Sequence, residues 1–213
     1  MPWYGRLVME RRLGPGRLAI AAGALTAAIV LFAGVANAGS LYQGCDETAG
    51  TIFMDGQPGN IDHVVAGYKA ATHTVYVEGS HESSGGTING GITCQSSNWK
   101  LFTANLRDRA DRVRADAFGM SVSGYTALPS SMKAVLRGGT GADRIVGHSG
   151  PDDISGGDGK DVLTGQAGND MLRAADGYAD TVSCGPGQDK AQVDDADTRT
   201  GCEDVTLVVR PTR

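Results

Sequence analysis

Residues 138–173 read GGTGADRIV, GHSGPDDIS, GGDGKDVLT and GQAGNDMLR, four consecutive units of nine residues in strict phase. Every unit has glycine at its first and fourth positions, aspartate at its sixth and a large aliphatic residue at its eighth. The glycines are Gly138, Gly141, Gly147, Gly150, Gly156, Gly159, Gly165 and Gly168. The aspartates are Asp143, Asp152, Asp161 and Asp170, and the aliphatic residues are Ile145, Ile154, Leu163 and Leu172. This period predicts an all-β fold, a parallel β-solenoid in which each unit pairs a glycine-rich turn with a short strand. The alternative interpretation is a flexible Gly/Asp-rich linker. The strict phase of four consecutive units argues against it, because a linker has no need of such a period.

The pattern G-G-x-G-x-D-x-U-x resembles the RTX family, also called hemolysin-type calcium-binding nonapeptide repeats. In that family two units make one coil of a β-roll, and calcium lies between successive turns, bound by aspartate carboxylates and backbone carbonyls. The resemblance implies that residues 18 apart share an edge, so that Asp143 lies over Asp161 and Asp152 over Asp170. It also implies that the glycine turns supply the carbonyl ligands of Ca²⁺.

Electrostatics favours a metal independently of this resemblance. Stacked strands repeat at about 4.8 Å, and two carboxylates about 5 Å apart repel by about 3 kcal/mol at an effective dielectric constant of 20. A divalent cation between them removes the repulsion, and oxygen ligands on flexible turns suit calcium better than magnesium. Four buried aliphatic side chains are few against the ordering entropy of 36 residues. We therefore expect the repeats to be largely disordered without calcium.

Three residues depart from the pattern. His148 and Gln166 replace the second glycine of their units, and Pro151 occupies the fifth position of the second unit. We expect individual calcium sites to be weakened or absent there. The four histidines have no ligand spacing, and each is interpreted as a lone surface residue: His63, His73, His81 and His148.

The first 38 residues have the three parts of a secretory signal. Four arginines precede an uncharged apolar run, Leu18 to Val35, and Ala36-Asn37-Ala38 supplies a cleavage site. Cleavage after Ala38 predicts a secreted, extracellular protein with no stable membrane insertion. The alternative is an uncleaved anchor, since a run of about 18 residues is at the lower limit for a membrane span.

The chain without this signal has 15 basic and 23 acidic residues, a net charge of −8. Twelve aspartates lie between residues 138 and 197, where they face four basic residues. This excess favours cations as partners and argues against nucleic acid or anionic lipid. A protein or cell-surface partner is not identified by the sequence.

Four cysteines, all after the signal, fit an oxidising compartment and structural disulfides. Four cysteines allow three pairings, and the sequence does not decide among them. We favour Cys184 with Cys202 and Cys45 with Cys94, which would close the two ends of the molecule. The stretch DTVSCGPGQD followed by GCEDV resembles the disulfide-closed terminal coil of secreted RTX-type proteins from high-GC Gram-positive bacteria.

The remaining segments complete the predicted organisation. Residues 39–105 read as an irregular β-rich region, with candidate strands at Thr51–Met54, His63–Val65, Thr74–Glu78 and Trp99–Thr103. Residues 106–137 read as a degenerate coil without calcium and a connector, because Ala110–Val113 matches Ala142–Ile145 without the glycines. The calcium-binding repeats span 138–192, with one residue inserted at Ala174, and a C-terminal cap spans 193–213. The apolar stretch Val205–Val209 is expected to cover the last coil.

The expected function is calcium binding without catalysis, in a structural, adhesive or cell-envelope role. The alternative is a small secreted hydrolase or toxin with an unrecognised site in residues 40–135, where His63, His73 and Glu78 are the residues to test. The aromatic residues of this region are expected to form a small core instead of a ligand platform. They are Phe53, Tyr76, Trp99 and Phe102.

Overall fold

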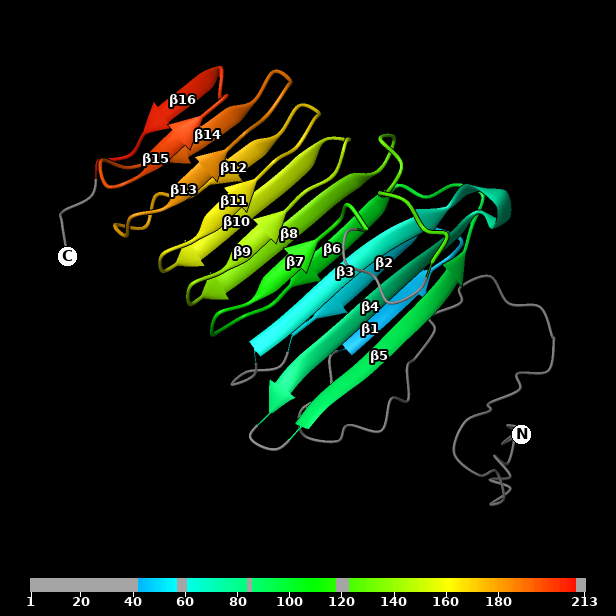
Figure 1. The fold of residues 1–213 in the computed structure, drawn as a ribbon. Helices are drawn as coiled ribbons and strands as arrows, with labels where there is room; N and C mark the ends of the chain where they lie inside the picture. The colour runs from blue at the N-terminus through cyan, green and yellow to red at the C-terminus, as the bar shows by residue number, and fades with distance from the viewer. Residues whose placement is uncertain (1–41, 57–60, 84–85, 118–122, 210–213) are drawn as a thin grey trace, which may run out of the picture. The chain divides into compact units, whose positions relative to one another are not determined.

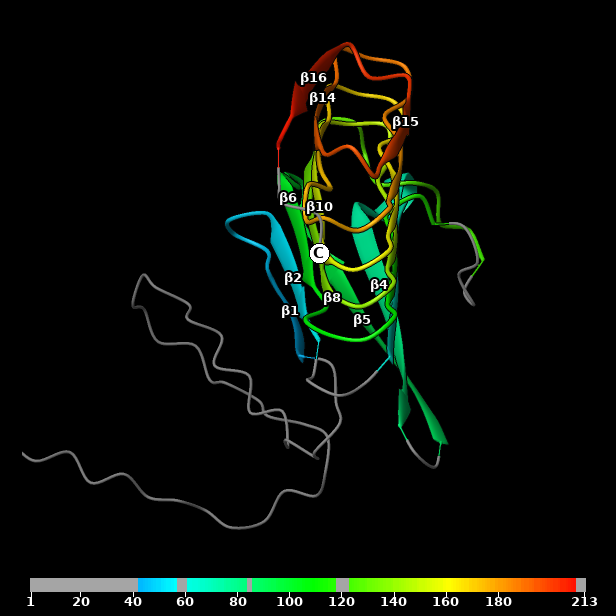
Figure 2. The ribbon, with the colours of Figure 1, turned by 90° about the vertical axis from the view of Figure 1, so that its left-hand side faces the viewer.

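The computed structural model describes residues 42–56, 61–83, 86–117 and 123–209, and the predicted signal of residues 1–38 lies outside them (Figure 1). Almost all of the described elements are strands, which form two eight-stranded sheets that face each other (Figure 2). In spatial order the first sheet contains β1 (Tyr42–Asp46), β2 (Thr51–Asp55), β6 (Leu101–Asn105), β8 (Lys133–Thr140), β10 (Asp152–Asp158), β12 (Met171–Arg173), β14 (Lys190–Val193) and β16 (Asp204–Leu207). The second contains β15 (Thr198–Thr200), β13 (Thr181–Ser183), β11 (Val162–Thr164), β9 (Arg144–Val146), β7 (Arg112–Arg114), β3 (Ile61–Lys69), β4 (Thr74–Ser83) and β5 (Gly86–Gln95). A short 3₁₀ turn, Ala70–Thr72, joins β3 to β4.

Consecutive units alternate between the two sheets, so that each strand pairs in parallel with the strand two units away. Ile154 of β10 pairs with Leu172 of β12, and Leu163 of β11 pairs with Ile145 of β9. Two consecutive units therefore make one coil, and the predicted β-roll is confirmed. Antiparallel pairing occurs where β1 joins β2 and where the hairpin of β4 and β5 joins β3.

The solenoid begins well before the strict repeats. In β7, Arg112 and Val113 pair in parallel with Arg144 and Ile145, which is the alignment that the degenerate coil predicts. β7 also pairs in parallel with β3, and β2 with β6. The region expected to be irregular therefore supplies coils of the same two sheets.

The core lies between the sheets and consists of one inward side chain per short strand. All four aliphatic residues at the eighth position of the repeats are fully buried, as predicted. Val182 and Ala191 continue their rows after the insertion, each with 1% of its surface exposed. Because stacked coils place like residues over one another, each side chain packs against its counterparts above and below.

The aromatic prediction is only half right. Phe102 and Trp99 are buried, but Phe53 is 42% exposed because it lies between the inward residues Ile52 and Met54 on β2. Successive residues of a strand point to opposite faces. Tyr76 lies between the buried Val75 and Val77 and packs against the ring of Tyr125, with 5.5 Å between ring centroids.

Two disulfides join Cys45 to Cys94 and Cys184 to Cys202, the pairing that the sequence favoured. The first links β1 to β5, strands of different sheets, and the second links positions 18 residues apart, one coil. Beyond it, β16 extends the first sheet instead of folding over the open coil. Val205 packs against the core, whereas Leu207 is 53% and Val209 88% exposed.

Candidate metal centre

A ladder of aspartates runs along the edge where the strands of the second sheet begin. The backbone N–H of each donates a hydrogen bond to Oδ1 of the aspartate one coil further on, with N–O distances of 2.7–2.9 Å. We call this series the first column; it contains Asp62, Asp111, Asp143, Asp161, Asp180 and Asp197. The predicted stacking of Asp143 over Asp161 is therefore present.

A second ladder runs along the other edge, where the strands of the first sheet begin. Asp152 N donates to Asp170 Oδ1 at 2.9 Å, Asp170 N to Asp189 Oδ1 at 2.8 Å, and Asp189 N to Glu203 Oε2 at 2.9 Å. This series is the second column. The separation of bonded aspartates changes from 18 to 19 residues between Asp161 and Asp180, as the insertion near Ala174 requires.

The ladder bonds use only one oxygen of each carboxylate. The other oxygen, Oδ2, is buried and has no hydrogen-bond partner among the described residues in Asp111, Asp143, Asp161, Asp170, Asp180 and Asp189. These six side chains belong to residues with at most 2% of their surface exposed. A buried acceptor without a partner costs about 1–3 kcal/mol, and more when it is charged. Its repetition along both columns indicates that a ligand is needed to complete these turns.

The first glycine of a repeat allows oxygen atoms of two successive coils to approach closely beside it. A methyl group built on Gly138 would overlap Asp143 Oδ2 and lie 2.6 Å from the carbonyl oxygen of Gly156, one coil away. On Gly165 it would overlap Asp170 Oδ2 and lie 2.5 Å from the carbonyl oxygen of Cys184. A carboxylate oxygen and a carbonyl oxygen from two successive coils thus converge beside a glycine. Oxygen atoms from carboxylates and carbonyls are the ligands that Ca²⁺ prefers.

The extended coils keep the carboxylates without the glycine. By strand register, Leu106, Ala174 and Cys184 occupy the position of the first glycine ahead of Asp111, Asp180 and Asp189, and all three side chains are buried. The unpartnered Oδ2 and the glycine therefore occur together in Asp143, Asp161 and Asp170.

Burial sets the protonation of these carboxyls. Loss of water raises the pKa of Asp143 and Asp161 to about 6 and that of Asp170 to about 7, and neighbouring carboxylates add to the effect. The same cause raises the pKa of Asp111 and Asp180 to about 8. Backbone N–H donors oppose the shift but do not cancel it. A bound cation would reverse the preference, because it stabilises the ionised form.

The second unit differs, and the interpretation of His148 as a surface residue is wrong. Its side chain is fully buried, with Nδ1 2.6 Å from Asp152 Oδ1 and Nε2 3.2 Å from the carbonyl oxygen of Pro129. The backbone N–H of His148 donates to Asp152 Oδ2 at 2.7 Å. Burial disfavours a charged ring, but the hydrogen bond and charge of Asp152 outweigh it and raise the pKa of His148. Both oxygens of Asp152 are thus already bonded.

Among the described residues, no group of three or more His, Cys, Asp or Glu side chains is arranged to hold a metal. A site in the columns must therefore combine a few carboxylates with backbone carbonyls, which suits a hard ion. The sequence identified Asp143, Asp161 and Asp170 but missed the first-column position of Asp62. Only Gly56 hints at it: a methyl group there would overlap Asp62 Oδ2 and lie 2.5 Å from the carbonyl oxygen of Leu106.

Of the three residues proposed for a hydrolytic site, His73 lies apart from His63 and Glu78, which are on neighbouring strands because Glu78 pairs with Val65, two residues from His63. His63 pairs with Ser80, whereas His73 lies beyond the opposite end of β3, six residues or about 20 Å along the strand. His73 Nδ1 lies 3.0 Å from the hydroxyl of Tyr68, beside a cavity of about 230 Å³. Glu78 faces outward between the buried Val77 and Gly79.

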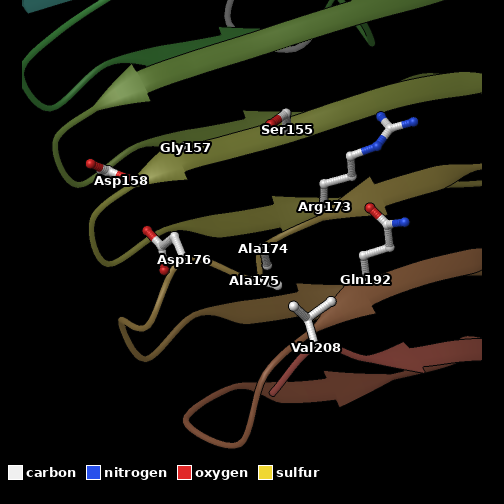
Figure 3. A pocket seen from close by; sticks show the side chains of 9 residues that line it. All are labelled: Ser155, Gly157, Asp158, Arg173, Ala174, Ala175, Asp176, Gln192 and Val208. Atoms are coloured by element: carbon white, nitrogen blue, oxygen red, sulfur yellow. The ribbon is translucent and has the colours of Figure 1, made fainter. Parts of the chain in front are cut away.

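A second cavity of about 280 Å³ lies over β10, β12 and β14, where Arg173 and Gln192 stand on neighbouring strands and Asp158 and Asp176 on neighbouring turns (Figure 3). Its described lining includes Ser155 but no histidine that could activate a hydroxyl. Among the described lining residues, the hydroxyl in contact with a histidine is that of Tyr68, and no serine of either lining is hydrogen-bonded to a histidine.

Comparison with known families matches residues 137–172 to the RTX calcium-binding nonapeptide repeat, in four copies. Such repeats bind calcium ions, are typically non-catalytic and commonly occur in extracellular proteins. Comparison of the chain with curated proteins and with solved structures finds no match. Within the described ranges, no helix has the length and hydrophobicity needed to cross a membrane.

Proposed function

We propose that this chain, in which residues 137–172 are RTX calcium-binding nonapeptide repeats, is a secreted protein whose β-roll is completed by calcium. The observation that carries the proposal is the buried Oδ2 of Asp143, Asp161 and Asp170, which no described group satisfies. Calcium supplies the positive charge that these carboxylates need. Backbone carbonyls of the stacked turns, such as that of Gly156, supply the remaining protein ligands.

In the folded roll, the chain's own residues orient the carboxylates toward the turn glycines. The ladder bond from Asp143 N to Asp161 Oδ1 orients one carboxylate oxygen along the column, so the other faces the glycine of its own turn. The turn glycines Gly138, Gly141, Gly156, Gly159, Gly165 and Gly168 let successive turns approach closely enough to share an ion. Binding and folding are then one process, because the ligands come from two coils.

A structural or adhesive role at the cell envelope fits this chemistry best. Calcium is abundant outside cells, and a roll that orders on reaching it would be exported unfolded and then folded. The two disulfides agree with an oxidising compartment. We also propose removal of residues 1–38, and a division into the extended solenoid of residues 39–137, the repeats of 138–192 and the terminal segment of 193–213.

Calcium counted per chain by isothermal titration calorimetry tests the proposal in three proteins. Asp161→Asn should lower the number of bound ions, because it removes a buried carboxylate from the first column. Asp153→Asn is the matched control: its carboxylate lies outside the columns and bonds Arg137 at 3.0 Å and Arg173. It should leave the count unchanged. Absence of calcium binding by the unmodified chain would reject the proposed function.

A further inference from the structure

We infer that the turn of the second repeat, residues 147–152, is closed by His148 in place of calcium and fastens the connector before β8 to the roll. We call the three groups involved, His148, Asp152 and the Pro129 carbonyl, the histidine latch. This inference rests on the proposed function, since it concerns which of the repeats take up an ion. It separates the second of the four matched repeats, which is closed by histidine, from the other three, which take up calcium.

The backbone of this turn departs from that of the others. The second position of the other units has a positive φ, 118° at Gly139, 113° at Gly157 and 84° at Gln166. The fourth position does too, with 143° at Gly141, 140° at Gly159 and 133° at Gly168. Neither His148 nor Gly150 adopts a positive φ. The turn around Pro151 therefore presents its backbone groups differently.

Both carboxylate oxygens of this turn already have hydrogen-bond partners close to the histidine. Asp152 Oδ2 accepts the backbone N–H of His148 and Oδ1 faces the ring Nδ1, at 2.7 and 2.6 Å. In contrast, Oδ2 of Asp170, one coil further along the same column, has no partner among the described residues. A calcium ion at Asp152 would have to displace two hydrogen bonds that are shielded from water. The second column therefore begins to bind calcium at Asp170.

The same ring holds the connector. His148 Nε2 lies 3.2 Å from the Pro129 carbonyl oxygen, and a methyl group built on Gly150 would lie 2.7 Å from this nitrogen and 2.5 Å from the Ser130 carbonyl oxygen. Leu128 and Met132, on either side, are buried in the core. The connector thus covers the space beside the second repeat, and one side chain bonds both partners.

Gln166 shows that replacing the second glycine is not sufficient to remove a site. It occupies the same position in the fourth unit, keeps the positive φ and leaves Asp170 Oδ2 unpartnered. The matched pair His148→Gly and Gln166→Gly therefore separates the latch from a general effect of glycine. Both variants restore the repeat pattern, but only His148→Gly removes a side-chain hydrogen bond from a column carboxylate, the one to Asp152 Oδ1.

The experiment counts calcium ions per chain by calorimetry in the unmodified protein, His148→Gly and Gln166→Gly. We expect one additional ion in His148→Gly and no change in Gln166→Gly. Equal, non-zero counts in the unmodified chain and His148→Gly would overturn the latch and leave the proposed function intact. A count of zero in the unmodified chain would instead reject the proposed function itself.

A second pair of variants keeps the test decisive if His148→Gly does not fold. Asp152→Asn and Asp170→Asn alter adjacent coils of one column with the same chemistry. We expect Asp152→Asn to bind as many ions as the unmodified chain and Asp170→Asn to bind fewer. Loss of an ion in Asp152→Asn would show that Asp152 is a calcium ligand and that the latch is not what closes this turn.

Discussion

Replacing Leu163 with alanine tests whether packing of the roll and binding of calcium are a single equilibrium. Leu163 is fully buried, and it pairs with Ile145 on one side and with Val182 on the other. A buried leucine truncated to alanine typically costs 2–5 kcal/mol, so we take about 3 kcal/mol for this site. The side chain lies in the core and has no oxygen that could bind an ion, so its direct effect is on packing.

The packing energy lost in Leu163→Ala should raise the calcium concentration that is needed for folding. When ions bind only the folded state, each tenfold rise in free calcium stabilises that state by about 1.4 kcal/mol per ion. If two ions bind during folding, about 3 kcal/mol is recovered by a roughly tenfold higher calcium concentration. The midpoint of calcium-induced folding should therefore rise roughly tenfold in Leu163→Ala.

Far-UV circular dichroism during a calcium titration measures this midpoint. Thr164→Ala is the control, because Thr164 is on the same strand, faces outward and is only partly buried. Its midpoint should move much less. A lower melting temperature in Leu163→Ala with an unchanged calcium midpoint would refute the coupling, since packing would then have been lost without affecting the binding equilibrium.

Three further predictions follow from the turns and the terminal coil. Because burial raises the pKa of Asp170 to about 7, and of Asp143 and Asp161 to about 6, calcium binding should release protons. Acidification from about pH 8 to about pH 6 should weaken binding roughly tenfold at a carboxyl of pKa about 7, and affinity independent of pH would contradict this. Without calcium the sign reverses: the folded state binds more protons than the unfolded state above about pH 4, so its stability should fall as the pH rises toward 8. Gly159→Ala should destabilise the calcium-bound roll by more than the roughly 1 kcal/mol expected of Gly177→Ala. Both glycines have positive φ, but only Gly159 would place its methyl group against a carbonyl, that of Gly141; equal melting temperatures would show that turn stacking is unimportant. Replacing Cys184 and Cys202 by alanine opens a loop of 18 residues and should cost about 3 kcal/mol, measured by urea unfolding at saturating calcium. Unchanged stability would mean that the terminal coil unfolds independently of the rest.

The repeats were predictable because each position has one physical task. The nine-residue period places Ile145, Ile154, Leu163 and Leu172 inward, and the structure buries all four. The offset of 18 residues brings Asp143 to Asp161, and the slip of one residue after Arg173 appears as the 19-residue spacing of Asp161 and Asp180. In a solenoid, residues at the same repeat position also pair between neighbouring coils. The nine-residue pattern therefore predicts both the strands and their pairing.

The rest depended on contacts that no short pattern contains. His148 is buried because the connector supplies the Pro129 carbonyl, 19 residues earlier, and Asp152 supplies the carboxylate. Asp62 joins the first column through Asp111, which is 49 residues later in the sequence. The long insertion between them, which carries the hairpin of β4 and β5, hides the coil period there. Phe53 was misplaced because its neighbours Ile52 and Met54 are also apolar, which masks the alternation of the strand.

Calcium titration of the purified protein, followed by far-UV circular dichroism with magnesium as the control ion, tests the central claim most directly. We predict a cooperative gain of β-sheet signal with calcium and little change with magnesium, because the carbonyl-rich turns do not offer the strict octahedron that magnesium requires. A protein with the same spectrum and melting temperature in chelator, calcium and magnesium would contradict the claim. The unpartnered aspartate oxygens would then be a feature of a metal-free solenoid.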